Sequence, residues 1–420
     1  MSVFKGDRIN IELVGGSHDE EMILKMSGTP SFDLDMEKIN DYLERRKPSG
    51  EFQTQRRESD IPEFKKGLIN GRIDGDIEVS VKNREIKKED YDRLYGKPRP
   101  SHADYCQFVK DGDPDFSGGG RFSGRLTVLY CVAGGVAASY LEKKGIKIKG
   151  EIISVGKAKK DAAEFSAEVL KELNEAKENS DSVGAVIECV AKGVPAGLGN
   201  DYFEGIEGKI SSLVYAIPGV KGVEFGKGFA ISELKGSEAN DQWRYDGGKA
   251  VTETNNSGGI NGGITNGMPI VLKVAFKPTP SIGKPQKTID LLSGENTTIE
   301  IKGRHDVCFA LRAVPVVESA VAIALLDELL KVEEGSTVKD LRAELDKIDD
   351  DLRDLFLRRM KISGAIGRLK AQNGDKILSE ERERAILKRV TKGLNEKDAE
   401  IINKLYEEIF HLSRKEQKNL

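Results

Sequence analysis

The chain has 420 residues, which is long enough to bury two or more separate cores. Its 66 lysines and arginines against 70 aspartates and glutamates give a net charge of -4, so no overall field favours a nucleic acid or an anionic membrane as partner. The four cysteines lie far apart without a C-x-x-C pair, which argues against a disulfide framework or a zinc site and suits a reducing compartment.

No targeting or membrane segment is predicted. The first residues, MSVFKGD, lack the apolar stretch of a signal peptide. The longest uncharged stretch, 126–141, is too short and too rich in glycine and alanine to cross a bilayer, so it predicts a buried helix. We therefore expect a soluble, cytoplasmic protein that binds neither membranes nor nucleic acid.

Glycine divides the chain into two parts. Only four of the 45 glycines follow residue 337, so many turns and short strands are expected in the first part and almost pure helix in the second. Thr337 is suited to cap the first helix of the second part. These features predict a first domain over 1–331, a linker over 332–337 and a second domain over 338–420.

Strand-like and helical runs are mixed within the first domain. Residue alternation and β-branched residues predict strands at 77–81, 186–190 and 269–276. Apolar periodicity predicts helices over 36–46, 125–143, 162–177 and 315–330. Because the strands are not regularly followed by helices, an α+β fold with antiparallel sheets is favoured over a doubly wound parallel sheet.

Several segments of the first domain are suited to an anion. Three histidines stand near carboxylates: His18 in GGSHDE, His102 in RPSHADY and His305 in GRHDVC. The segment 118–125, GGGRFSGR, is a glycine-rich turn that opens a helix and offers backbone N–H groups and two guanidinium groups. Most glycine-rich turns are only turns, and a loop histidine is more often structural than catalytic. The residues alone predict a domain that binds a phosphorylated, anionic small molecule.

The second domain begins with a helix whose apolar residues are spaced by four and three. These residues form the seam along which one helix packs on another: Leu341, Leu345, Ile348, Leu352, Leu355, Ile362, Ile366 and Leu369. Arg359 interrupts the seam, and Lys370 follows on the same face. Two buried cations need an anionic ligand, so the seam predicts the wall of an anion pocket. The alternative is a plain three-helix dimerisation module.

Over residues 1–330 the sequence resembles the chorismate synthases. The segments RPSHADY, SGGGRFSGR, GSEANDQW, NNSGGINGGITNG, KPTPSI and KGRHDVCFALRAVPVVESA occur in the order of that family. The resemblance implies a β-α-β sandwich, usually tetrameric, that binds reduced FMN and 5-enolpyruvylshikimate 3-phosphate. The family reaction is a 1,4-anti-elimination of phosphate and a C6 proton, which yields chorismate without net redox change.

The resemblance also implies roles for single residues. It matches His18 and His102 to the histidines that stabilise or protonate the leaving phosphate, and Asp306 to a base beside the flavin N5. The positions that clamp substrate phosphate and carboxylates are Arg46, Arg56 and Arg125. The positions that hold the flavin are Arg121, Ser123, Gly219, Gly262, Lys277, Thr279, Ser281 and Arg304. No metal is implied, and the lack of a dinucleotide-binding fingerprint predicts an external flavin reductant.

A few residues depart from the family pattern. Gly16 stands where glutamate is usual, and Phe122 and Leu126 replace a serine and a glutamate of the flavin loop. Asp19 and Glu51 are expected to put negative charge where the anionic substrate lies. An alternative for the first domain is therefore a flavin-binding scaffold that no longer turns over.

Residues 338–420 resemble the all-helical chorismate mutases, since LRAELDKIDDDLRDLFLRRM, IGRLK, ERERAIL and HLSRKEQ hold that family's spacing. The resemblance implies a three-helix domain in an intertwined dimer that rearranges chorismate to prephenate. Catalytic roles fall to Arg359, Lys370 and Gln417, the last two as donors to the ether oxygen. Substrate binding falls to Arg342, Ser379, Arg382, Glu383 and Ser413. Arg342 points about 100° away from Arg359 around the helix, which suits a contact with the partner's site.

The two resemblances support each other, because the product of the first reaction is the substrate of the second. Together they predict a bifunctional enzyme of aromatic amino acid biosynthesis that forms a homotetramer or a dimer of dimers. Its expected partners are small-molecule substrates and an external flavin reductant. Two alternatives remain for the helical domain: a non-catalytic sensor of chorismate or prephenate, and a module that only oligomerises.

Overall fold

The computed structural model describes residues 1–17, 19–54, 58–83, 94–116, 120–160, 165–301, 306–334, 338–376 and 378–418. Two compact units divide the chain, Met1–Glu333 and Glu334–Leu420. The predicted linker over 332–337 is wrong at its start, because helix α7 (Val314–Glu334) continues through residue 334. The expected cap Thr337 lies outside the described residues.

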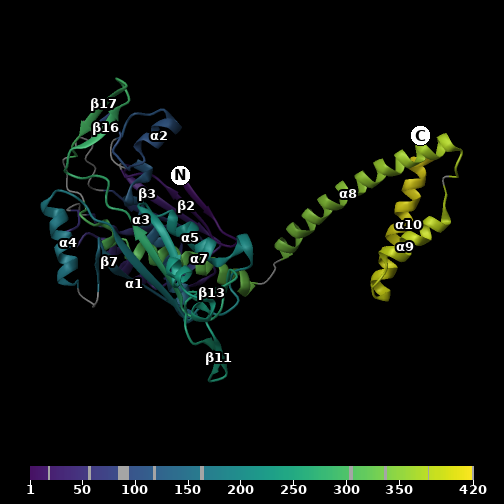
Figure 1. The fold of residues 1–420 in the computed structure, drawn as a ribbon, viewed down its shortest axis with the longest axis horizontal. Helices are drawn as coiled ribbons and strands as arrows, with labels where there is room; N and C mark the ends of the chain where they lie inside the picture. The colour runs from purple at the N-terminus through teal and green to yellow at the C-terminus, as the bar shows by residue number, and fades with distance from the viewer. Residues whose placement is uncertain are drawn as a thin grey trace. The chain divides into compact units, whose positions relative to one another are not determined.

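The first unit is built on two antiparallel sheets (Figure 1). The first sheet has the order β1 (Ser2–Lys5), β2 (Asn10–Val14), β3 (Glu21–Ser27), β6 (Arg72–Lys82) and β4 (Phe32–Asp33), with β5 (Pro62–Ile69) also paired to β6. The second sheet has the order β10 (Val220–Phe225), β15 (Ile270–Phe276), β9 (Ala185–Lys192), β7 (Lys147–Val155) and β8 (Ala158–Lys159). Every described strand pair is antiparallel, so the predicted α+β class is confirmed.

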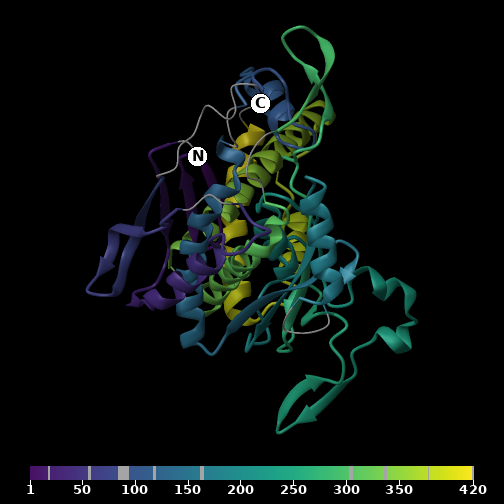
Figure 2. The same cartoon turned by 90° about the vertical axis from the view of Figure 1, so that its left-hand side faces the viewer.

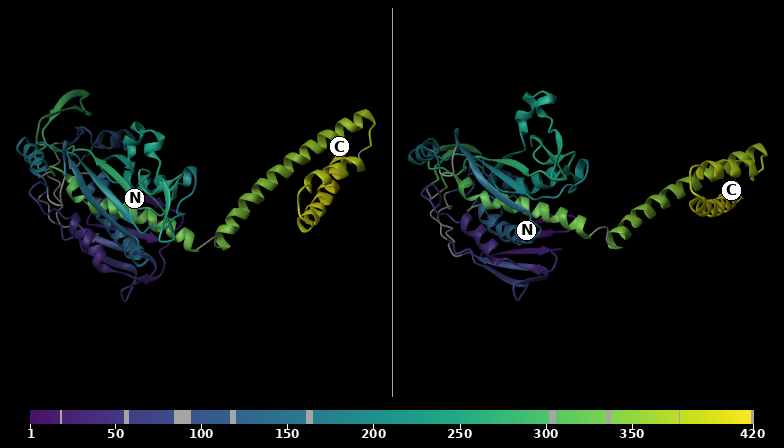
Figure 3. Two further views of the ribbon diagram at one scale, coloured as in Figure 1. Left: turned by 60° about the horizontal axis from the view of Figure 1, so that its bottom comes forward. Right: turned by 90° about the horizontal axis from the view of Figure 1, so that it is seen from below.

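Two apolar helices lie between the sheets, as the right-hand view of Figure 3 shows. Helix α3 (Thr127–Lys143) contacts β3 of the first sheet and β7 of the second. By length and composition alone, the stretch Gly124–Lys143, which contains this helix, could cross a membrane. However, 83 % of its apolar 18-residue window is buried in the unit, as expected for a core helix. Helix α7 lies beside it, and α1 (Met36–Arg46) packs on α3. The predicted β-α-β sandwich is confirmed.

The remaining elements lie around this sandwich. The helices are α2 (Asp104–Asp111), α4 (Ala167–Glu178), α5 (Ile206–Tyr215) and α6 (Gly236–Ala239). Three two-stranded hairpins are β11 (Trp243–Asp246) with β12 (Lys249–Thr252), β13 (Ile260–Asn261) with β14 (Ile264–Thr265), and β16 (Gln286–Asp290) with β17 (Glu295–Ile299). The hairpins β11–β12 and β16–β17 project from opposite ends of the unit (Figure 2). The predicted helix over 162–177 starts too early, because Ser166 caps α4 by accepting from the Val169 N–H.

Glycine lets α3 and α7 cross closely. A Cβ on Gly134 of α3 would overlap the Cα and Cβ atoms of Ser319 on α7. We expect Gly134→Ala to lower the free energy of unfolding by about 1–3 kcal/mol, because the added methyl group overpacks the crossing. Thermal denaturation checks this, with Gly208→Ala as control, since the exposed helical Gly208 of α5 has open space around it. Equal melting temperatures for the two variants would contradict the prediction.

The second unit consists of three helices, α8 (Val338–Asn373), α9 (Glu380–Val390) and α10 (Glu396–Lys418), as predicted. Helix α10 packs on α8 where Ser363, Gly364 and Gly367 are buried, and a Cβ on Gly367 would lie 3.0 Å from the Cα of Gln417. The apolar seam lies on another face of α8. Its described residues from Leu345 to Leu369 are 44 to 63 % exposed in this single chain.

Candidate active site

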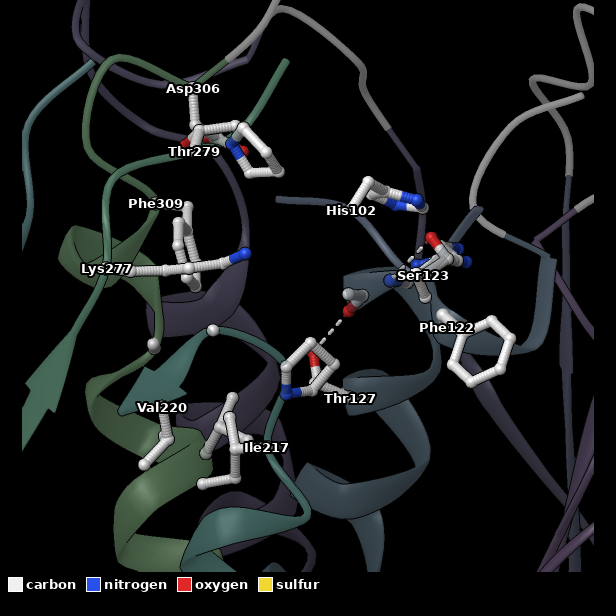
Figure 4. A pocket seen from close by; sticks show the side chains of 18 of the residues that line it. His102, Phe122, Ser123, Thr127, Ile217, Val220, Lys277, Thr279, Asp306 and Phe309 are labelled. Atoms are coloured by element: carbon white, nitrogen blue, oxygen red, sulfur yellow. Dashed lines mark hydrogen bonds between the residues drawn. The ribbon is translucent and has the colours of Figure 1, made fainter. Parts of the chain in front are cut away.

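A cavity of about 940 Å³ opens in the first unit between the loops that follow α1, β6 and β15 and the N-terminal end of α3 (Figure 4). Among the described residues that line it, eight are arginine or lysine and three are aspartate or glutamate. A polar lining with this excess of cations favours an anionic ligand. The volume lies at the upper end of the range for small-molecule sites, so a substrate and a cofactor fit together.

Two buried arginines that line the cavity share one carboxylate. Arg46, at the end of α1, donates from Nη1 to Asp60 at 3.1 Å, and Arg125 donates from Nη1 to the other Asp60 oxygen. Arg46 also donates to the Thr127 hydroxyl and to the Gly124 and Arg125 carbonyls. Burial and then the nearby Arg312 lower the pKa of Arg46 to about 10, so the guanidinium stays charged at neutral pH. One carboxylate therefore faces two buried cations.

Arg125 has donor capacity left over. Its Nε donates to Asn83 Oδ1 at 2.9 Å and its Nη1 to Asp60. The Arg125 side chain is only 5 % exposed, and its Nη2 is buried without a hydrogen-bond partner among the described residues. A buried guanidinium N–H without an acceptor is costly, so its presence at a cavity wall indicates that a ligand supplies the acceptor.

In Figure 4, His102 lies across the cavity from Lys277 and Asp306. Its Nδ1 contacts Oδ1 of Asp104. Arg99 donates to the same carboxylate from its backbone N–H, from Nε at 2.7 Å and from Nη2 at 2.8 Å. Burial raises the pKa of Asp104, but hydrogen bonds from Arg99 and His102 outweigh it and lower the pKa to about 2.

Asp306 is held by two groups at the edge of the cavity. Arg312 donates to its two oxygens at 3.1 and 2.8 Å, and the Thr54 backbone N–H donates at 2.9 Å. Arg312 lies in the 3₁₀ turn η6 (Phe309–Arg312), just before α7. The carboxylate is thereby oriented at the cavity wall, where it can accept a proton from a ligand.

The segment after β15 supplies a second polar wall. Lys277 donates to the Ser101 carbonyl, which ties this segment to the loop of His102. Burial and then Lys221 lower the pKa of Lys277. The Thr279 hydroxyl is buried without a hydrogen-bond partner in the described chain, and Ser281 lies next to it in the lining. These groups are suited to a phosphate or another anionic group.

Part of the cavity wall is apolar. Ile217, Val220 and Phe309 line it, and the Phe309 ring meets Phe276 edge-on at 5.5 Å. Gly219 has φ +92°, and a Cβ there would overlap the Phe309 ring, so glycine is needed for both reasons. The wall is suited to a flat ring system beside the cationic groups.

Ten predicted residues of the first domain meet in this cavity: Arg46, His102, Arg121, Ser123, Arg125, Gly219, Lys277, Thr279, Ser281 and Asp306. Gly262 does not line it and sits in the turn between β13 and β14. His18, Arg56 and Arg304 lie outside the described residues. The Ser17 hydroxyl, next to His18 in the sequence, is buried without a described partner.

The expectation that Glu51 opposes an anionic substrate is wrong. Glu51 is exposed, pairs with Lys177 of α4 at 2.7 Å and does not line the cavity. Asp19 is also exposed and outside the lining. Phe122 does line it, half-exposed and with the Arg121 guanidinium 5.1 Å from its ring centre.

Sequence reasoning missed four charged residues of this site: Asp60, Arg99, Asp104 and Arg312. Arg99 and Asp104 stand inside the RPSHADY segment and Arg312 inside ALRAVP, so the motifs contained them without showing their pairing. Asp60 has a φ of +48°, which is unusual for a residue other than glycine and indicates a position held by its two arginines.

In the second unit, three predicted residues meet between α8 and α10. Arg359 donates to the Ser413 hydroxyl, and the Gln417 amide donates to Ser363 at 2.9 Å. The other amide atom of Gln417, Oε1, is buried and has no partner among the described residues. Arg359 and Lys370 are half-buried, so the expectation of two buried cations in the seam is wrong for the single chain.

The other predicted residues of this unit lie apart from that group. Glu383 pairs with Arg414 at 2.6 Å, beside a cavity of about 320 Å³ between α9 and α10. Ser379 caps α9 through its backbone, and Arg382 is exposed. Arg342 is exposed and 17 residues before Arg359, about 25 Å along the helix, so it cannot reach the same pocket in one chain.

Comparisons with known proteins agree with this division. Residues 9–330 match the chorismate synthase family, and residues 341–418 match the family of type II chorismate mutases. The chorismate synthase of Thermococcus kodakarensis is 42 % identical over 346 residues, which cover 78 % of this chain and 97 % of that protein. The chorismate synthase of Aeropyrum pernix is 40 % identical over 363 residues, 80 % of this chain and 96 % of that protein.

A solved crystal structure of chorismate synthase has the same fold as the first unit. It aligns with a TM-score of 0.62 at 24 % identity and covers 83 % of this chain and 100 % of its own. The chain thus belongs to the chorismate synthase family and continues into a type II chorismate mutase domain, so that it combines a lyase and an isomerase of aromatic amino acid biosynthesis.

Proposed function

We propose that the cavity of the first unit binds 5-enolpyruvylshikimate 3-phosphate and reduced FMN together and releases phosphate and chorismate. The second unit then rearranges chorismate to prephenate. The main support for the first reaction comes from Arg125. Its buried Nη2 has no acceptor among the described residues, and it lies in a strongly cationic cavity.

The residues present fit a flavin mononucleotide. The apolar wall of Ile217, Val220 and Phe309 can cover a ring system, and the Thr279 hydroxyl and the Lys277 ammonium are donors for its polar groups. When bound, the reduced flavin supplies electron density to the substrate and a basic nitrogen for the C6 proton. The sequence lacks a dinucleotide-binding fingerprint. The proposal therefore includes an external reductant that reduces the flavin.

The chain's own residues then bind, orient and exchange protons. Arg46 and Arg125 stabilise the charge on the substrate's phosphate and carboxylates. His102 donates a proton from Nε2 to the leaving phosphate oxygen, or balances its charge. Asp306, oriented by Arg312, takes up a proton at a carboxylate oxygen.

In the second unit, Arg359 and Lys370 would bind the two carboxylates and the ether oxygen of chorismate in a reactive conformer. Gln417 is placed to help, because one atom of its amide faces Ser363 and the other lacks a partner. If the amide turns by 180°, its oxygen can accept from Ser363 and its nitrogen can donate to the ether oxygen.

We propose that the site of the second unit is completed by a second copy of the chain. The exposed seam from Leu345 to Leu369 supports this, because an apolar stripe of this length is unfavourable in water. In the first unit, Tyr202, Phe203, Phe229 and Tyr245 are 82 to 100 % exposed, which supports a further interface and a tetramer. The four cysteines are free, as is usual in a reducing compartment, which supports the cytoplasm as the proposed location.

Leu352→Asp is expected to break the pairing of α8 and to lower mutase activity more than tenfold, since a carboxylate in an apolar interface is strongly disfavoured. Sedimentation velocity checks the assembly and chorismate consumption checks the activity. The control is Leu357→Asp, because Leu357 is equally exposed but lies off the seam. An unchanged sedimentation profile for Leu352→Asp would exclude this interface.

The proposed pair of reactions is tested by anaerobic incubation with dithionite-reduced FMN and 5-enolpyruvylshikimate 3-phosphate, while chorismate and prephenate are quantified over time. Prephenate with only transient chorismate supports both activities in one chain. Chorismate that accumulates leaves the helical unit as a sensor or an oligomerisation module. If neither forms but added chorismate still becomes prephenate, the first unit is a scaffold without turnover.

A further inference from the structure

Asn83, which does not line the cavity, joins two segments of the first unit. It is the first residue after β6, and its side chain is buried. Its Oδ1 accepts from Nε of Arg125 at 2.9 Å, and its Nδ2 donates to the carbonyls of Gly16 at 3.2 Å and Asp19 at 2.7 Å. One amide therefore links an arginine of the cavity to the loop between β2 and β3.

The chemistry of these partners decides the orientation of the Asn83 amide. Backbone carbonyls only accept hydrogen bonds, and a guanidinium group only donates them. The amide nitrogen must therefore face Gly16 and Asp19, and the amide oxygen must face Arg125. If the amide turned by 180°, its oxygen would lie against two carbonyl oxygens and its N–H groups against another donor. The amide thus has one stable orientation.

The backbone of Asn83 is fixed by the first sheet. Strand β6 pairs with β3 as far as Lys82, which lies opposite Glu21, and the Asn83 N–H donates to the Glu20 carbonyl at 2.9 Å. The hydrogen-bond ladder thus continues one residue beyond the strand. A side chain that starts from a paired strand and has one stable orientation is a rigid support for its partner.

Two of the three nitrogens of Arg125 are held by Asn83 and Asp60. Nε donates to Asn83, and Nη1 donates to Asp60, which also pairs with Arg46. Because a guanidinium group is planar, two such bonds fix the directions of all its N–H groups. The remaining Nη2 is buried and has no acceptor among the described residues. Its N–H groups are therefore oriented before a ligand binds.

We propose that Asn83 is a positioning residue of the first active site. Its amide fixes the plane of the Arg125 guanidinium, and with it the direction of Nη2, and ties Arg125 to the loop between β2 and β3. The inference rests on the proposed binding of the substrate's anionic groups by Arg125, and Asn83 itself does not contact the substrate. An arginine fixed in this way loses little rotational freedom when the substrate binds.

The test is a double-mutant cycle of Asn83→Leu and Arg125→Lys. Leucine has a similar volume but offers neither an acceptor nor a donor. We expect Asn83→Leu to lower kcat/KM for chorismate formation with reduced FMN by about 10- to 100-fold, since a misplaced binding group can cost that much. In the Arg125→Lys background it should cause less than about a threefold further loss, because its effect passes through Arg125.

Ligand binding separates a positioning role from a merely structural one. Calorimetry with oxidised FMN, which does not support turnover, should show the Kd of 5-enolpyruvylshikimate 3-phosphate raised about tenfold in Asn83→Leu, the effect of a weakened hydrogen bond to a charged group. The Kd of FMN alone should stay within about twofold, because neither Asn83 nor Arg125 is assigned to the flavin. An equal loss of FMN affinity would indicate a general loss of structure and overturn the inference. Asn296→Leu is the control, since Asn296 is exposed in β17 and does not line the cavity.

The outcomes separate this inference from the proposed function. If Arg125→Lys changes neither kcat/KM nor the Kd of the substrate, the proposed role of Arg125 fails and the inference fails with it. If Arg125→Lys is impaired but Asn83→Leu behaves like the unmodified protein, or costs the same factor in both backgrounds, the inference alone is overturned.

If Asn83→Leu does not fold, a crystal structure of the unmodified protein with oxidised FMN and 5-enolpyruvylshikimate 3-phosphate decides. An Arg125 side chain that keeps its Nε bond to Asn83 while Nη2 donates to the substrate supports the inference. Any other arrangement of Arg125 overturns it.

Discussion

Replacement of Arg125 by lysine is expected to lower kcat/KM for chorismate formation by about 100- to 1000-fold, the usual effect of removing one donor to a developing negative charge. Lysine keeps the charge but cannot serve Asn83, Asp60 and a ligand at once, as the three nitrogens of Arg125 are placed to do. The measurement is steady-state chorismate formation under anaerobic conditions with varied substrate. Mutase activity on added chorismate should stay at the wild-type level.

Arg72→Lys is the matched control for this variant, because Arg72 is an exposed arginine of β6 that pairs with Asp33 on the surface. A change at Arg72 should leave kcat/KM within about twofold. Chorismate formation by Arg125→Lys at a rate near that of the control would show that Nη2 contacts no substrate group. Arg125 would then no longer support the proposed binding of the substrate in this cavity.

The second large effect is expected at Arg359. Arg359→Ala should reduce the rearrangement of chorismate by about 100- to 1000-fold and leave the synthase reaction intact, so that chorismate accumulates. Arg359 lies beside the α8–α10 contact, where it donates to Ser413. A guanidinium group has further N–H groups, which can donate to a substrate carboxylate. Time courses from 5-enolpyruvylshikimate 3-phosphate, with both products quantified, measure the two reactions in one experiment.

The neighbouring Arg358→Ala provides the control for Arg359. Arg358 is exposed and points about 100° away around α8, so its loss should change neither product. Equal prephenate formation by the two variants would indicate that the pocket near Ser413 and Gln417 does not carry the rearrangement. A loss of the oligomer in Arg359→Ala, seen by sedimentation, would assign the effect to assembly instead.

Local signals in the sequence predicted most of the elements. The apolar periodicity of α1 gave its bounds without error, and the alternation of β9 and β15 follows from one face turned toward the core. The start of α4 was missed because its cap, Ser166, lies inside a stretch that also has helical periodicity. Caps depend on one hydrogen bond, which periodicity does not contain.

The candidate site was predicted as a set of residue types and not as a set of pairs. The glycine-rich turn and the KPTPS segment indicated an anion site, and six of the ten predicted residues that line the cavity come from these two segments. The sharing of Asp60 by Arg46 and Arg125 joins segments far apart in the chain. Likewise, Glu51 was expected near the substrate from its place in the motif, but its side chain pairs with Lys177 of α4.

The sequence by itself determined the fold class, the two-part organisation and the residue types of both sites, because periodicity, glycine content and motifs are local properties. Only the tertiary structure decided which donors are already used and which remain for a ligand. Arg46 is almost fully engaged by the protein, whereas Arg125 keeps a buried nitrogen without a described partner. Hydrogen bonds form only when donor and acceptor lie about 3 Å apart. Only folding brings groups from distant segments of the chain to that distance.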